Sequence, residues 1–390
     1  MLHRIFVFMT KLVSQVSYWE RSTLLGHFDY LVIGNGLIGK QIAYHLQQTH
    51  KDSRVGLADR SPFSAGASTR NAGFACFGSV TELMADLERS SEQEVFDLVE
   101  KRYRGIELLK SDFGADAIGF MPTGSWEIFL RDQENSFEDA CEKLAYFNKQ
   151  MQSVTGRPEV FRRASTSDFG FNDLGQGIVN TLEGQLDTGL LNRIIHKRLL
   201  ALGVEPLYGL TVTDFTASAT GYEVYTEEGY ILNTRKLVIA TNAFAGKLIP
   251  GLDIVPARGQ VLITTPFEKV PFTGTFHSDC GYMYFRNVGN RILIGGGRNH
   301  FLQQEQTTDI SITDNLQTYI EQYLREWLIP GRSFETDMAW SGIMAMGSGE
   351  KLPLLQQLDD NLVICVRMGG MGVALASVLA REVSGIFART

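Results

Sequence analysis

The start of the chain alternates between apolar runs and helical periodicity, which predicts a β-α-β unit. Residues 28–33 form a short, mostly apolar run, which is typical of a buried parallel strand. After a glycine-rich segment, Ile38, Ile42 and Leu46 recur at the spacing of one helix face. A second apolar run at residues 54–58 ends at Asp59. Two strands joined by such a helix are expected to lie parallel in one sheet, with a right-handed crossover.

The same patterns predict the remaining elements. Residues 62–80 are rich in Gly, Ala and Ser, so we expect a loop there. Helical periodicity covers residues 81–112, 134–152, 312–324 and 373–386, and Asp187 is the expected cap of a helix that runs to Leu200. Strand-like runs cover residues 119–130, 210–215, 221–226, 230–232, 236–240, 260–264, 281–286, 291–295 and 361–366.

Strand-rich and Rossmann-like segments alternate along the chain without an internal repeat. We therefore predict an α/β protein in which a Rossmann-like domain is interleaved with an antiparallel-β domain. The first domain is expected at residues 26–92, 155–257 and 336–390. The second is expected at residues 93–154 and 258–335, and residues 1–25 are interpreted as an N-terminal extension.

Composition and charge exclude two classes of protein. Of the 390 residues, 44% are apolar and 21% are charged, the balance of an ordinary globular protein and not of a disordered one. The 44 acidic residues outnumber the 36 basic ones, for a net charge of −8. That charge, with no basic cluster, argues against a nucleic-acid partner.

Cysteine, histidine and hydropathy patterns indicate a cytoplasmic protein without a metal site. The four cysteines and seven histidines show no CxxC and no metal-ligand spacing, so we expect free thiols in a reducing compartment. No apolar run reaches the ~18 residues of a membrane span. The apolar patch at residues 5–9 is interrupted at Lys11, and is shorter than the core of a signal peptide. Export remains the alternative, and Met9 is a second possible start.

The strongest local motif is the glycine run Gly34, Gly36 and Gly39, with Asp59 twenty residues beyond it. The three glycines are expected to allow a tight turn, a close approach to a pyrophosphate and helix–strand packing, in that order. The helix start at Leu37 and Ile38 would offer N–H groups to phosphate. Asp59 would accept from a ribose hydroxyl, and an acid here disfavours a 2′-phosphate. The alternative is a glycine-rich turn in an unrelated α/β fold.

Five later segments resemble the D-amino-acid-oxidase (DAO) superfamily of FAD enzymes. They are residues 66–73, 240–243, 256–260, 340–344 and 367–374, in the order of that superfamily, and the resemblance spans residues 28–388. Within the superfamily the branch of gamma-glutamylputrescine oxidase and glycine oxidase is the most similar. The resemblance implies a Rossmann-like domain of the GR2 type that holds FAD. Covalent attachment would need a cysteine just after the Trp340–Gly342 motif, and residues 343–347 contain none, so noncovalent FAD is expected.

The resemblance also implies the site residues. A hydride would pass from the carbon next to an amine to the flavin N5, and the imine product would hydrolyse. Tyr282, Tyr284 and Arg286 are the implied catalytic residues, although tyrosines at this spacing commonly serve sheet packing. The implied FAD-binding residues, those of the motif included, are Gly34, Gly36, Leu37, Ile38, Gly39, Asp59, Arg60, Ala67, Ser68, Arg70, Asn71, Ala72, Gly73, Thr241, Asn242, Trp340, Gly342, Gly369, Gly370, Met371, Gly372 and Val373.

The chain departs from its relatives where an amino-acid substrate would be held. Arginines that grip the substrate carboxylate in related oxidases correspond here to Met344 and Gly370. The substrate is then either an amine without a carboxylate or an amino acid held by another cation. The candidate cations are Arg70, Arg258, Arg286 and Arg298, each of which could instead be solvated or ion-paired.

Several alternatives stay open. Residues 295–297 do not open a helix, so no second nucleotide site is expected, and electrons would leave to oxygen or to an unknown acceptor. A dehydrogenase of the same fold would pass them to a quinone or a carrier protein. A flavin-holding protein without catalysis is a further possibility, motivated by the missing arginines. Cys76 and Cys280 are interpreted as small buried side chains, and Lys351 as an exposed one.

Overall fold

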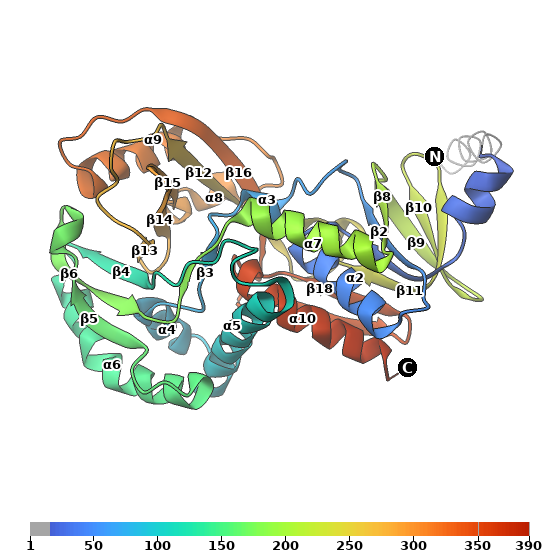
Figure 1. Cartoon of the computed structure of the whole chain (residues 1–390), viewed down its shortest axis with the longest axis horizontal. Coiled ribbons are helices and arrows are strands. Elements are labelled where there is room, and N and C mark those ends of the chain that lie inside the picture. Colours follow the sequence, from blue (N-terminus) through green and yellow to red (C-terminus); the bar gives the residue numbers. More distant parts are fainter. Residues whose placement is uncertain (1–15, 350, 390) are drawn as a thin grey trace.

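The computed structural model describes residues 16–349 and 351–389, which form two large mixed sheets with helices between and around them (Figure 1). The first sheet, on the right in Figure 1, has the order β17-β18-β11-β1-β2-β8, and β10 and β9 extend it beside β11. Its strands are β1 (Phe28–Ile33), β2 (Val55–Asp59), β8 (Glu205–Tyr208), β9 (Val212–Ser218), β10 (Gly221–Thr226), β11 (Ile231–Ile239), β17 (Leu354–Asp359) and β18 (Leu362–Val366).

The second sheet, on the left in Figure 1, has the order β16-β12-β15-β14-β13-β4-β6-β5. Its strands are β4 (Ser125–Leu130), β5 (Phe161–Ser165), β6 (Asp173–Asn180), β12 (Val255–Thr264), β13 (Thr275–Ser278), β14 (Met283–Val288), β15 (Arg291–Gly296) and β16 (Thr336–Met346). A two-stranded sheet, β3 (Phe74–Ala75) and β7 (Gly184–Gln185), completes the strands among the described residues.

Helices cover the first sheet and join it to the second. The α-helices are α2 (Leu37–Thr49), α3 (Ala67–Arg70), α4 (Val80–Leu87), α5 (Glu92–Phe113), α6 (Glu134–Thr155), α7 (Thr188–Leu202), α8 (Leu302–Glu305), α9 (Asp314–Tyr323) and α10 (Gly372–Phe387). Shorter 3-10 and π segments are η1 (Glu20–Leu24), η2 (Ser167–Phe169), η3 (Asn242–Lys247), η4 (Arg298–Phe301) and η5 (Leu324–Leu328). No helix among the described residues is both long and apolar enough to cross a membrane.

The predicted β-α-β unit is present, and the burial of β1 explains why its sequence is apolar except at the half-buried Asp29. β1 pairs in parallel with both β2 and β11. Tyr30 and Val32 belong to the core on one face of the sheet, whereas Leu31 and Ile33 belong to the core on the other. Because successive side chains point to opposite faces, a strand buried on both sides needs apolar residues at every position.

Capping side chains start three of the helices, and the sequence predicted the cap of one of them. The Asp187 side chain accepts a hydrogen bond from the Leu190 N–H at 2.8 Å, which confirms the predicted cap of α7. Ser91 and Glu94 form a capping box at the start of α5, as Ser79 and Glu82 do at the start of α4. Each box satisfies N–H groups that have no partner within the helix.

Three predicted elements were wrong in detail. The helical stretch expected at 81–112 is two helices, since α4 ends at Leu87 and α5 begins at Glu92. Residues 230–232 and 236–240 were expected as separate strands, but one strand, β11, runs through both. The polar residues between them stay in the strand because Asn233 and Thr234 pair with β10 on the outer part of the sheet. The loop expected at 62–80 contains α3 and β3. The strands β5, β6, β8, β13, β16 and β17 were not predicted.

Sheet membership differs from the predicted domain boundaries in three places. β5 and β6, expected in the first domain, pair in the second sheet, and so does β16, which pairs with β12 along its length. α5, expected in the second domain, packs instead on α10. Local sequence patterns define a strand but not the sheet that it joins, because pairing partners lie far away along the chain.

Candidate active site

A cavity of about 780 Å³ lies where the two sheets meet, and most of the predicted site residues line it. This volume is in the range of small-molecule and cofactor sites in proteins. Its lining includes the following predicted residues: Gly34, Gly36, Leu37, Ile38, Asp59, Arg60, Ala67, Ser68, Arg70, Asn71, Ala72, Thr241, Asn242, Tyr282, Tyr284, Gly342, Gly369, Gly370, Met371, Gly372 and Val373.

Four predicted residues, Gly39, Gly73, Trp340 and Arg286, are not in the lining, and each supports the wall from behind. A Cβ atom at Gly39 would lie 1.8 Å from the Gly34 carbonyl oxygen, as expected for close helix–strand packing. The Trp340 indole N–H donates to the Arg70 carbonyl at 2.9 Å. Arg286 Nη1 donates to the carbonyls of Gly73 and Leu186, so this guanidinium joins two wall segments and does not face a substrate.

The end of the cavity near the glycine loop has the features of a nucleotide site. Gly34 has a φ of +115°, and a Cβ there would meet the Ala240 carbonyl at 2.5 Å, so only glycine fits this turn. The Asp59 carboxylate accepts from the N–H groups of Asn35 and Ser61 at 2.7 and 2.8 Å, which fixes it at the end of β2. The Leu37 N–H, predicted to face phosphate, donates to the Ser68 hydroxyl at 2.6 Å.

Unsatisfied polar atoms around the cavity indicate that it accommodates a polar ligand. Asn35 Oδ1, Thr241 Oγ1 and Asn242 Oδ1, which belong to lining residues, are buried and have no hydrogen-bond partner among the described residues. Buried polar atoms are nearly always paired, so these atoms point to groups supplied from outside. With the glycine loop and Asp59, they fit a dinucleotide such as FAD.

The opposite end of the cavity is aromatic. Phe74 packs edge-on against Tyr284, with ring centroids 5.9 Å apart, and against His277 at 5.2 Å. Tyr282 and Tyr284 both line the cavity, although β14 begins only at Met283, one residue after Tyr282. Burial raises the pKa of Tyr284 to about 12, so its hydroxyl keeps its proton at neutral pH. This end offers an aromatic surface with a few hydrogen-bonding groups.

Acidic side chains beside the aromatic end were missed by the sequence interpretation. Glu82 lines the cavity, and its Oε2 accepts from the Ser79 N–H at 3.1 Å. Behind it, Glu183 is 1% exposed and accepts from the N–H groups of Phe77 and Gly78. Burial raises the pKa of Glu183 to about 8 and that of Glu127 to about 7. The Ser79–Glu82 spacing could have identified a helix start, but nothing local indicates burial beside a cavity.

We expect Glu183→Gln to remove a pH dependence of stability. Folded Glu183 keeps its proton until about pH 8, whereas a carboxyl in an unfolded chain ionises near pH ~4.3. Between these values the folded state binds more protons, so rising pH lowers the free energy of unfolding, by up to about 1.4 kcal/mol per pH unit. Above the pKa of folded Glu183 the free energy of unfolding no longer falls with pH on account of this group. Glutamine keeps a carbonyl acceptor for the two N–H groups.

Urea unfolding between pH 5 and 9 measures this effect as the difference between wild type and Glu183→Gln. Glu100→Gln is the matched control, since Glu100 lies in an exposed ion pair with Arg104. The control is expected to keep the wild-type profile. Parallel profiles for Glu183→Gln and wild type would show that Glu183 is ionised in the folded protein.

The cysteines and Lys351 differ in part from expectation. Cys76 is buried at the cavity wall, as predicted, and burial raises its pKa. Cys280 is exposed, which corrects the prediction of a buried side chain. Lys351 is exposed, as predicted, and it also lines the cavity and forms an ion pair with Asp86 at 2.6 Å. The described part of the chain contains no group of three or more side chains suited to a metal ion.

Comparisons with known proteins agree with this geometry. The family model described as FAD dependent oxidoreductase (DAO) matches residues 29–385. Glycine oxidase from Geobacillus kaustophilus superposes with a TM-score of 0.75 at 17% identity, over 93% of this chain and 95% of the other. L-proline dehydrogenase from P. horikoshii superposes with a TM-score of 0.73 at 18% identity, over 93% and 94%. A curated L-2-hydroxyglutarate dehydrogenase from Salmonella houtenae is 21% identical, over 78% of this chain and 73% of its own length.

Proposed function

The chain belongs to the DAO family of FAD-dependent oxidoreductases, and we propose that it oxidises the C–N bond of a primary or secondary amine or of an amino acid. When bound, FAD would supply the acceptor for a hydride from the carbon next to the nitrogen, and the imine product would hydrolyse in water. The observation that carries this proposal is the cavity itself, where the glycine loop and Asp59 at one end meet an aromatic wall at the other. Solved proteins of this fold are named as glycine oxidase, L-proline dehydrogenase and iminodiacetate oxidase, which favours a nitrogen substrate.

The chain's own residues support this reaction in three ways. Gly369 and Gly370 have φ values of +55° and +82° and lead from β18 into α10. The free N–H groups and the positive end of α10 then lie at the cavity, where they would stabilise negative charge that develops on a bound ring. Phe74 and Met344 would exclude water, which favours the neutral, reactive form of an amine.

Tyr282, Tyr284 and Glu82 would orient the substrate. The two tyrosines offer hydroxyl groups, and Glu82 offers a carboxylate oxygen that can accept from a substrate N–H. Arg286 has no such part, because both of its hydrogen bonds go to backbone carbonyls of the wall.

Spectroscopy of the purified protein tests the proposal. We expect a flavin spectrum that leaves the protein on acid precipitation, because the cofactor is bound without a covalent link. Under anaerobic conditions, a panel of amines and amino acids is expected to contain one class that bleaches this spectrum. Rapid recolouring with oxygen would indicate an oxidase, and slow recolouring with rapid dye reduction a dehydrogenase. A flavin that no amine or amino acid reduces would overturn the proposal.

The curated relative favours a second candidate, the oxidation of a 2-hydroxy acid. Such a reaction releases a hydroxyl proton, so it needs a base near the substrate. Burial lowers the pKa of His277, which lines the cavity, so its imidazole is neutral and able to accept a proton. Adding 2-hydroxy acids to the same anaerobic panel separates the two candidates, because only one class is expected to bleach the flavin.

A further inference from the structure

Of the four arginines that the sequence offers as substrate cations, three are already bound to the protein. Arg70 donates to the carbonyls of Ala65 and Ser341 at 3.0 and 2.9 Å. Arg286 donates to two wall carbonyls, as described above. Arg258 is 4% exposed and forms an ion pair with Glu305 at 2.7 Å. Arg298 differs, since it lines the cavity and has no hydrogen bond or ion pair with any described residue.

The other cations of the cavity wall have partners as well. Arg60, next to Asp59 at the nucleotide end, stacks over the Phe244 ring at 4.1 Å, and Lys247 faces the same ring. Lys351 is paired with Asp86. Arg102 donates to the Phe77 carbonyl at 3.2 Å, and the carboxylates of Glu82 and Asp86 lie within electrostatic reach of it. Arg298 is therefore the one cation of the described wall that has no hydrogen bond, ion pair or aromatic ring contact with a described residue.

Arg298 lies at the aromatic end of the cavity, within electrostatic reach of the Tyr284 hydroxyl. This hydroxyl also lines the cavity and has no hydrogen-bond partner among the described residues. A Cβ atom at Gly259 would lie 3.9 Å from it and 3.1 Å from the Met344 methyl carbon. Tyr284 therefore adjoins Met344, the position at which relatives carry a carboxylate-binding arginine. A guanidinium and a phenol hydroxyl, both free to donate, form a complementary pair for a carboxylate.

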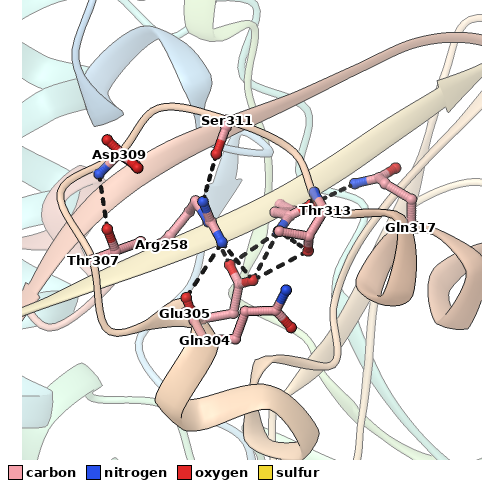
Figure 2. Close-up of polar contacts among 9 residues, drawn as sticks. Arg258, Gln304, Glu305, Thr307, Asp309, Ser311, Thr313 and Gln317 are labelled. Carbon is pink, nitrogen blue, oxygen red and sulfur yellow. Dashed lines mark hydrogen bonds and ion pairs between the residues drawn. The ribbon is translucent and has the colours of Figure 1, made fainter.

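A buried polar network fixes the segment that carries Arg298. α8, which follows η4, ends at Glu305, which is 0% exposed and accepts from Arg258 Nε and Nη2 at 2.7 and 2.9 Å. Arg258 Nη1 also donates to the Ser311 hydroxyl at 2.7 Å (Figure 2). Gln260 donates to Glu305 and accepts from the Thr313 N–H at 3.0 Å.

These contacts attach residues 298–313 to β12, whose Gly259 and Val261 line the same cavity. The segment also brings Ile310 into the lining. A network that is fully hydrogen-bonded and buried is rigid. Arg298 is thus held on a fixed support, with its side chain left for a ligand.

We propose that Arg298, together with the Tyr284 hydroxyl, binds a carboxylate group of the substrate. The substrate class is then an amine that carries a carboxyl group, and not a simple alkylamine. The proposal rests on the proposed function for the oxidised group, but the anion site itself does not depend on which bond is oxidised. The carboxylate is then held by Arg298, on the β15–η4 side of the cavity, and not by a side chain at position 344.

Ligand binding to the FAD-loaded protein tests the anion site without turnover. Acetate and benzoate are titrated against the oxidised flavin spectrum, with acetamide and benzamide as uncharged matches. In Arg298→Met we expect the Kd of the carboxylates to rise roughly 10- to 150-fold, the range of a lost hydrogen bond to a charged group. In Arg298→Lys the Kd of the carboxylates is expected to lie between those of wild type and Arg298→Met. The Kd of the amides is expected to be the same in all three proteins. Arg104→Met, which removes an exposed arginine, is the control.

Steady-state and anaerobic kinetics then test the substrate class. Amino acids are compared with the amines that lack their carboxyl group, and Arg298→Met is expected to raise KM for the former while leaving the latter unchanged. Equal carboxylate affinity in wild type and Arg298→Met, or no carboxylate binding to wild type, would overturn the anion site. A wild-type preference for the decarboxylated amines would do the same. If carboxylates bind but no amine or amino acid reduces the flavin, the proposed function fails and the anion site stands.

Discussion

Replacing Arg258 by methionine is expected to lower the free energy of unfolding by about 3–5 kcal/mol, because it leaves a buried carboxylate without its partner. Glu305 is 0% exposed, and its Oε atoms accept from both Arg258 and Gln260. Burial alone would raise the pKa of Glu305, but these hydrogen bonds and the charge of Arg258 bring it below the ordinary value. Without Arg258 the carboxylate must either take up a proton or draw in water.

Urea unfolding of the FAD-loaded protein measures this effect. The matched control is Arg104→Met, which removes an ion pair whose arginine side chain is 63% exposed. Exposed pairs contribute about 0–1 kcal/mol, so the control is expected to stay close to wild type. Equal losses in the two variants would mean that the Arg258–Glu305 pair behaves as a surface contact. Such a result would also remove the rigid support inferred for Arg298.

Replacing Gly105 by valine is expected to destabilise the protein by about 3 kcal/mol or more and to weaken FAD binding. Gly105 lies where α5 crosses α10, and a Cβ atom there would come 1.8 Å from the Ala374 carbonyl oxygen. The helices must separate to admit any side chain, because the obstacle is backbone. The displaced part of α10 is its first turn, which carries Gly372 and Val373 into the cavity lining.

Thermal unfolding and FAD titration of Gly105→Val check both effects. Gly385 offers the control. It lies in α10, the other of the two crossing helices, and no atom lies within 4 Å of a Cβ added there. Gly385→Ala is expected to be neutral or to stabilise by about 0.4–1 kcal/mol, since alanine restricts the unfolded chain. A Gly105→Val protein with wild-type stability would show that the α5–α10 crossing can open without cost.

Local chain features account for what the sequence predicted well. The β1–α2–β2 unit and the Asp187 cap each depend on residues close together along the chain. Hydrophobic periodicity and capping chemistry act over such short separations, so the sequence alone determines them. The five family segments extended this to the FAD fold, since their order along the chain carries information that no single segment holds.

Pairing over long separations accounts for what the sequence could not determine. β5, β6 and β16 join the second sheet because of partners elsewhere in the chain, and Gly105 is needed only because Ala374 lies against it. Glu183 owes its raised pKa to burial, which its neighbours in sequence do not indicate.

The arginines show the same division most clearly. The sequence alone determined that a carboxylate clamp is missing at Met344 and Gly370, and it supplied four replacements of equal standing. Only the tertiary structure decided among them. It pairs Arg258 with Glu305 and binds Arg286 to carbonyls of Gly73 and Leu186, which leaves Arg298 open to the cavity. A guanidinium has only N–H donors, so it is available to a ligand when the fold places no protein acceptor beside it. For Arg258 and Arg286 those acceptors come from distant parts of the chain, which the local sequence does not show.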